Sequence, residues 1–212
     1  MKFEEFIKRV QKMPVIETEM LLSGVSDPSP FKVQISRWQK AGKLIQLKRG
    51  VYLLAPEYRA IEVYDFYLAF VLQSPSYVSL EKAFEYYDLI PEAVQVYTSV
   101  TTKRTGKRES EAGRFSYRHI RESLFWGYAA IKLDRQTGFI ALPEKALLDY
   151  FYFRGTCISS EYFQEMRLQN LHTINFTKLK AFAKKFKKPG IIHIADQIKE
   201  FAIGKISQER AV

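Results

Sequence analysis

Six candidates for DNA contact, each able to form hydrogen bonds or carrying a positive charge, lie within one short segment, residues 29–40. They are Ser29, Lys32, Gln34, Ser36, Arg37 and Lys40. An arginine can bond a guanine edge in bidentate fashion and a glutamine can bond an adenine edge, whereas a lysine is better suited to a phosphate. The set predicts a contact with double-stranded DNA, in which Arg37 and Gln34 read bases. The alternative is a solvated helix face on a small structural domain.

A second basic group follows a few residues later. Lys48 and Arg49 precede Gly50 and lie between two β-rich runs, residues 44–47 and 51–54, which predicts a hairpin with a basic tip. Such a tip could reach the negative minor groove beside the contacted major groove. Because a Lys-Arg-Gly turn is also common as a plain solvated turn, its place after residues 29–40 is what favours a DNA contact.

Three short helices are expected to position these groups. Apolar residues at helical spacing predict a helix over residues 3–12, and a second helix over residues 17–22 stops at Gly24. Pro30 begins the third helix, which ends at Gly42. The buried face of this helix is expected to consist of Phe31, Ile35 and Trp38. Three helices followed by a basic hairpin is the order of a winged helix-turn-helix, so residues 1–56 are predicted to be a DNA-binding domain of that kind.

Residues 57–212 are expected to form an α+β domain with a helical C-terminal end, beginning after a boundary at residues 55–57. The predicted helices cover residues 59–73, 80–87, 143–153, 160–168, 175–187 and 190–203. The predicted strands cover residues 93–102, 115–120, 127–133 and 137–142. The fold class of the whole chain is therefore expected to be α+β.

The charge of the chain is positive and unevenly distributed. The 212 residues include 33 Lys and Arg against 23 Asp and Glu, a formal net charge of +10, which favours a polyanionic partner. Residues 1–56 hold ten basic and five acidic residues, residues 57–153 hold twelve and thirteen, and residues 154–212 hold eleven and five. Basic stretches at residues 103–108 and 178–188 suit nucleic acid, an acidic protein, an anionic membrane surface or plain solvation, and composition does not distinguish these.

Patterns typical of catalysis are not evident in the sequence. A single cysteine, Cys157, and three separated histidines form no zinc spacing, and no glycine-rich phosphate loop is present. Carboxylates at Glu81, Glu144 and Asp149 fall in helix patterns, where solvation or capping explains them. We therefore expect no catalytic residue, cofactor or metal. The enzymatic alternative is a metal-dependent nuclease or transferase that uses a carboxylate such as Asp149.

The surroundings of the protein can also be anticipated. The longest strongly apolar stretch, residues 64–72, is shorter than the roughly 20 residues that cross a bilayer. With one cysteine and no basic-apolar leader, the chain is expected to be a cytoplasmic protein without a membrane partner. We expect it to be a monomer in solution.

Three segments carry a resemblance to a known family. Residues 38–52 (WQKAGKLIQLKRGVY) resemble the end of the winged helix in the AbiEi family, the antitoxins of type IV toxin–antitoxin systems. Residues 75–83 (PSYVSLEKA) look like the short strand and helix that follow its first interdomain helix, and residues 141–149 (ALPEKALLD) look like its late proline-initiated helix. The matches run in order over residues 1–153, and this order is more specific than any single motif.

The resemblance implies a bifunctional repressor. Its N-terminal domain would bind inverted repeats in its own promoter, and its C-terminal domain would counter a cognate AbiEii-like nucleotidyltransferase toxin, with an additional role in DNA binding. The residues that transfer are restricted to the winged helix: Lys32, Arg37, Lys40, Lys48 and Arg49. The alternative is a winged-helix transcription factor whose C-terminal domain senses a small ligand.

Overall fold

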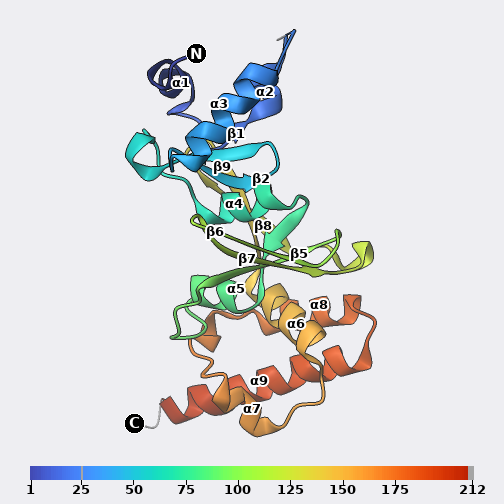
Figure 1. Cartoon of the computed structure of the whole chain (residues 1–212). Coiled ribbons are helices and arrows are strands. Elements are labelled where there is room, and N and C mark those ends of the chain that lie inside the picture. Colours follow the sequence, from blue (N-terminus) through green and yellow to red (C-terminus); the bar gives the residue numbers. More distant parts are fainter. Residues whose placement is uncertain (25, 210–212) are drawn as a thin grey trace.

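The computed structural model describes residues 1–24 and 26–209, and its fold is mixed α+β with two separate sheets. Figure 1 shows an elongated molecule, with the N-terminal helices at one end and the C-terminal helices at the other. The six-stranded sheet lies between them. The two basic ends of the sequence are therefore also the two ends of the molecule.

The N-terminal unit contains the helices and the hairpin that the sequence predicts. Its elements are α1 (Phe3–Val10), β1 (Ile16–Glu17), α2 (Thr18–Leu22), α3 (Ser29–Lys40), β2 (Leu44–Lys48) and β3 (Val51–Leu54). The strands form an antiparallel sheet in the order β1-β3-β2. Strand β1 was not expected, because two residues are too few for an alternating pattern to be recognised.

Helix α3 is held in place by a hydrogen bond at its start and by aromatic packing. The backbone N–H of Ser29, the first residue of the helix, donates to the Asp27 carboxylate at 3.0 Å. This hydrogen bond lowers the pKa of Asp27. Ile35 is buried, and the ring of Trp38 lies 4.7 Å from that of Phe6 on α1. The face of α3 that packs against α1 is thus the one expected from the spacing of its apolar residues.

The three-stranded sheet is buried on both faces. Tyr52 and Leu54 pack with α1 and α3, whereas the alternate residues Val51 and Leu53 belong to the large core of the rest of the chain. That core includes Leu68 of helix α4 (Asp65–Leu72). Because apolar contacts cross the boundary predicted at residues 55–57, the N-terminal unit is fixed against its neighbour.

The second sheet has six strands in the order β6-β7-β5-β4-β9-β8. Their bounds are β4 (Ser76–Val78), β5 (Val96–Thr101), β6 (Gly106–Ser110), β7 (Gly113–His119), β8 (Tyr128–Leu133) and β9 (Gln136–Ala141). Two pairs, β5 with β7 and β4 with β9, are parallel, and the others are antiparallel. Helix α4 lies on one face, and α5 (Leu80–Tyr86) and α6 (Pro143–Arg154) lie on the other (Figure 1).

The remaining helices complete the C-terminal end. They are α7 (Ser160–Glu165), α8 (Phe176–Lys185) and α9 (Pro189–Glu209). Short 3-10 helices occur elsewhere along the chain, at Pro56–Tyr58 after the hairpin and Glu122–Leu124 between β7 and β8, and at Leu171–Thr173 before α8. Asn175 caps α8 by accepting a hydrogen bond from the Lys178 N–H at 2.9 Å. Within residues 1–24 and 26–209, no helix has the length and apolar character that a membrane crossing requires.

Several expected elements have other bounds in the structure, and two of these differences have a clear physical reason. The helix predicted over residues 59–73 begins only at Asp65, because the side chain of Gln136 bonds the Tyr64 N–H and the Glu62 carbonyl and holds that segment extended. The basic stretch at residues 103–108, for which the sequence predicts no strand, runs into strand β6. Its pairing with β7 is a tertiary contact, which the charged composition of the segment does not indicate.

Candidate nucleic-acid interface

Helix α3 presents one continuous exposed stripe. Its members are Ser29, Lys32, Val33, Ser36, Arg37 and Lys40, and all six are exposed. Their spacing of three, four, seven, eight and eleven residues from Ser29 places them on a single helix face. The helix contains no acidic residue, and the three cations of this α3 stripe form no ion pair with any described residue. Their charges are therefore available to an anionic partner.

Gln34 lies off the stripe. It follows Phe31 by three residues and precedes Trp38 by four, so it shares the packed side of α3, and its Oε1 is buried without a hydrogen-bond partner among the described residues. Val33 takes the exposed position instead, with 50% of its surface accessible. A valine there can contact a thymine methyl group. Because Val33 lies three residues before Ser36, helical spacing would have placed it on the same exposed face.

The tip of the β2–β3 hairpin is anchored on both sides. The ammonium of Lys48 donates to the Val71 carbonyl at the end of α4, at 2.5 Å. The Gly50 carbonyl accepts hydrogen bonds from the N–H and the hydroxyl of Thr18 on α2, at 2.9 and 3.2 Å. Arg49 is exposed and forms no ion pair with a described residue. Of the two cations at the tip, Arg49 is the one that faces outward freely.

This difference gives a matched pair of variants. Arg49→Ala is expected to weaken DNA binding and to reduce the slope of log K against log salt by about one unit, because one phosphate is no longer neutralised. Lys48→Ala is expected to leave that slope unchanged and to lower stability by about 1 kcal/mol, because it removes a hydrogen bond between two elements. Fluorescence anisotropy over a salt series and urea unfolding measure the two effects. Equal flattening by both variants would contradict the anchored position of Lys48.

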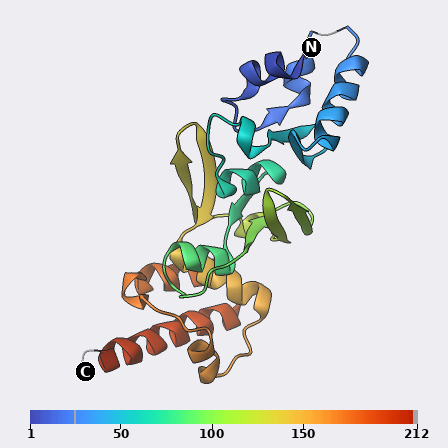
Figure 2. The ribbon, with the colours of Figure 1, turned by 60° about the vertical axis from the view of Figure 1, so that its left-hand side comes forward.

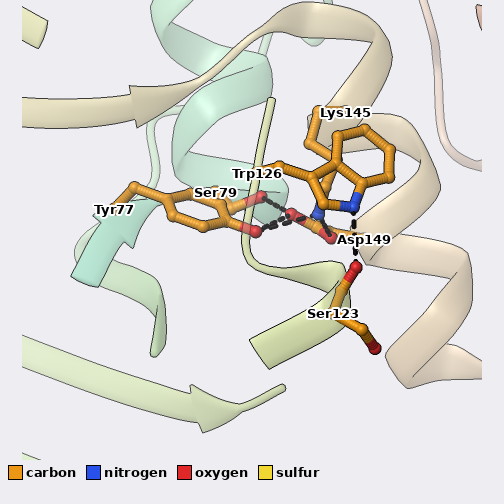
Figure 3. Close-up of polar contacts among 6 residues, drawn as sticks. All are labelled: Tyr77, Ser79, Ser123, Trp126, Lys145 and Asp149. Atoms are coloured by element: carbon orange, nitrogen blue, oxygen red, sulfur yellow. Dashed lines mark hydrogen bonds and ion pairs between the residues drawn. The ribbon is translucent and has the colours of Figure 1, made fainter. Parts of the chain in front are cut away.

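A second polar cluster lies buried inside the α+β part. Lys145 and Asp149 are one turn apart on α6, are both fully buried, and form an ion pair. Tyr77 on β4 and Ser79 at the start of α5 each donate a hydroxyl to Asp149 Oδ2 at 3.0 Å, and Lys145 Nζ donates to Tyr77 Oη at 2.9 Å (Figure 3). The expectation that Asp149 is solvated or capping is wrong. Helix α6 packs between α5 and α8, so this face of the helix never meets water.

Aromatic rings surround the lysine of this cluster. Its Nζ lies 5.0 Å from the ring centroid of Trp126 and 5.1 Å from that of Phe186. Gly127, at φ +76°, packs on the lysine stem, where an added Cβ would approach Cγ to 3.1 Å. Burial lowers the pKa of Lys145 and raises that of Asp149, because each charged form loses its water. The cluster links β4, α6 and the residue that precedes α5 through buried hydrogen bonds and one ion pair.

A hollow of about 810 Å³ opens between the sheet and helices α5, α6 and α7. Its apolar lining includes Phe84, Val96, Tyr150 and Met166. Its charged lining includes Lys107, Arg108, Glu109, Arg114 and Arg118 on the sheet, and Glu81, Glu92 and Glu165 outside it. The size is that of a small-molecule site, but the charges of the two signs balance, so no single ligand charge is selected.

No family model matches this chain, and no curated protein matches it either. The features that bear on function are therefore those of the chain itself. The strongest are the α3 stripe and Arg49, because they combine exposure, positive charge and hydrogen-bonding groups on one rigid helix and the adjoining turn.

Proposed function

We propose that this chain binds double-stranded DNA through residues 1–56, which form a winged helix-turn-helix. Helix α3 lies in the major groove, and the β2–β3 hairpin is a short wing. The observation that carries this proposal is the α3 stripe: two serines, a valine and three cations without an ion pair to any described residue, all on one exposed face. In winged helices the third helix reads base edges, while basic residues around it bind phosphates.

The packing of the N-terminal unit supports this function. Because its sheet is buried on both faces, α3 is held rigidly by the rest of the molecule and can present its side chains in a defined geometry. Arg37 lies in the last turns of the stripe and is the candidate for bidentate contact with a guanine. Lys32 and Lys40 flank it along the helix and bind phosphates, and Arg49 reaches the backbone or minor groove from the wing.

The test is binding to the DNA upstream of the protein's own gene. A labelled duplex of that region and a shuffled duplex of equal length are titrated at several salt concentrations. Tighter binding to the upstream duplex, with affinity falling linearly in log salt, is expected. Equal affinity for both duplexes would remove the sequence-specific part of the proposal.

We further propose that the protein is an AbiEi-like autorepressor and antitoxin. In this proposal the α+β part, residues 57–212, neutralises a cognate AbiEii-like nucleotidyltransferase toxin, and inverted repeats in the promoter are the operator. The C-terminal helices of this part, at the opposite end of the molecule from α3 in Figure 1, provide a surface for a second role. The resemblance of residues 38–52, 75–83 and 141–149 is what specifies that role.

The two activities are expected to separate in the full-length chain. The triple variant Lys32→Gln, Arg37→Gln, Lys40→Gln should lose repression of a promoter reporter and still rescue growth from the toxin, because the stripe lies outside the α+β part. A truncated protein is a poor choice here, since removing residues 1–56 would take Val15, Ile45, Leu47, Val51 and Leu53 out of the core that they share with the rest of the chain. Loss of rescue by a stable triple variant would contradict the division of roles.

The hollow favours a second candidate function, a transcription factor that senses a small ligand. Its volume of about 810 Å³ and its apolar lining suit a molecule of drug-like size. A ligand that binds saturably and shifts operator affinity would favour this function. Substitution of Tyr150 or Met166 in its lining should then weaken the ligand's effect without changing DNA binding in its absence.

A further inference from the structure

Strand β8 forms a free edge of the six-stranded sheet. It pairs with β9 on one side, and no described strand pairs with its other side. Figure 2 shows the β8–β9 hairpin standing out from the body of the molecule. Five of the six β8 residues are exposed and only Ile131 is half-buried, so no helix covers either of its faces. An exposed apolar strand edge is a template for pairing with another strand.

The register shows which backbone groups are unused. Leu133 faces Gln136 across the two-residue turn, and at the other end the Gly127 carbonyl accepts from the Leu142 N–H at 2.9 Å. Since hydrogen-bonded pairs alternate along an antiparallel ladder, the odd-numbered residues of β8 bond to β9. The N–H and C=O groups of Tyr128, Ala130 and Lys132 therefore point outward from the sheet.

We infer that β8 pairs antiparallel with β8 of a second copy of this chain, about a two-fold axis at Ala130. This register uses all three outward residues in both copies and forms about six backbone hydrogen bonds. Ala130 faces the partner's Ala130, and Tyr128 faces the partner's Lys132. An aromatic ring beside a lysine is a favourable cross-strand pair, and two alanines meet without a clash.

The opposite edge of the sheet indicates why β8 is the interface. Edge strand β6 carries three consecutive charged residues, Lys107, Arg108 and Glu109, which protect an edge against pairing. In β8 the single charged residue is Lys132. The self-pairing register places no like charges opposite each other, because Lys132 meets a tyrosine. The strand is thus complementary to itself.

Such pairing would join two six-stranded sheets into one continuous sheet. In this proposal the protein is a dimer, whereas the sequence led us to expect a monomer. The pattern of residues 127–133 predicts a strand, but it does not indicate that the strand lies at the edge of a sheet. A two-fold axis would also relate the two α3 stripes, and this consequence rests on the proposed DNA binding, since inverted repeats mirror the symmetry of a dimer. Dimerisation is measured in the absence of DNA. A result that contradicts the dimer can therefore be distinguished from one that contradicts the proposed DNA binding.

Sedimentation velocity tests the interface directly. The wild-type protein is expected to sediment as a dimer, and Ala130→Pro as a monomer with half the mass. Proline removes an outward N–H that β9 does not use, so the β8–β9 hairpin should remain folded, which circular dichroism checks. The control Ala130→Thr keeps the N–H and should remain dimeric. A monomeric wild type, or a folded Ala130→Pro variant that is still dimeric, would overturn the inference.

Disulfide trapping tests the register. In a Cys157→Ser background, which removes the exposed native thiol, Ala130→Cys places each new thiol opposite its symmetry mate. Most of this variant should cross-link under mild oxidation. The matched variant Ala129→Cys should not, because residue 129 and its symmetry mate are diagonal neighbours about 7–8 Å apart, too far for a disulfide without backbone movement. Cross-linking through residue 129 and not 130 would overturn the proposed pairing.

Discussion

Replacing Asp149 with alanine is expected to destabilise the folded protein by about 3–5 kcal/mol, because the Lys145 ammonium would remain fully buried without its counter-ion. The hydroxyls of Tyr77 and Ser79 would lose their acceptor as well. Urea unfolding followed by circular dichroism measures the change. The expected result is a lower midpoint with little change in the m-value.

A double variant separates the ion pair from simple packing. Lys145→Met with Asp149→Leu removes both charges and keeps apolar volume, so it should recover most of the lost stability. The recovery should be incomplete, since Tyr77 and Ser79 remain without an acceptor. If Asp149→Ala lowered the free energy of unfolding by less than about 1 kcal/mol, the proposed contribution of this buried ion pair to stability would be contradicted.

Neutralising the α3 stripe is expected to have the second large effect. Arg37→Gln alone should cost about 1–3 kcal/mol, or roughly 5- to 150-fold in affinity, if the guanidinium reads a base. Adding Lys32→Gln and Lys40→Gln should remove the neutralisation of two phosphates and weaken binding to every duplex. Fluorescence anisotropy with the upstream and shuffled duplexes measures both effects. Arg37→Gln should reduce the preference for the upstream duplex over the shuffled duplex. The two lysine changes should leave this preference unchanged.

A control with the same change in net charge is provided by the far end of the molecule. Lys184, Lys187 and Lys199 are exposed and form no ion pair with a described residue. Changing all three to glutamine removes the same charge as the stripe variant, but from α8, α9 and the turn between them. If the operator contacts come from residues 1–56 alone, this variant should bind DNA nearly as the wild type does, which separates a local contact from the long-range attraction of a basic protein. Weaker binding would instead show that the basic stretch at residues 178–188, which the sequence leaves open to nucleic acid, contributes to the DNA contact.

Regular spacing made much of the fold predictable. Phe3, Phe6 and Val10 repeat at helical intervals and are all buried on α1, and Pro143 begins α6 as expected. The strands at residues 115–120 and 137–142 were predicted to within two residues at each end. These elements have local signals that do not depend on what packs against them.

The site was predictable only in part, because several of its features depend on tertiary contacts. Gln34 is polar but lies on the packed side of α3. The spacing of the apolar residues defines the buried face of a helix only to within about one residue, so it did not show on which side Gln34 lies. Lys48 is turned toward Val71 by the packing of the sheet on α4. Asp149 is buried because α6 is covered by neighbours far away in the sequence. The edge position of β8 depends on the strand order, which no local pattern contains.

The central claim is that the α3 stripe contacts DNA, and the salt dependence of binding tests it most directly. The slope of log K against log salt should be smaller for Lys32→Gln, Arg37→Gln, Lys40→Gln than for the wild type, by about 0.9 for each phosphate that the variant no longer neutralises. The control at Lys184, Lys187 and Lys199 should keep the wild-type slope. A stripe variant that binds the upstream duplex with wild-type affinity and slope would contradict the account.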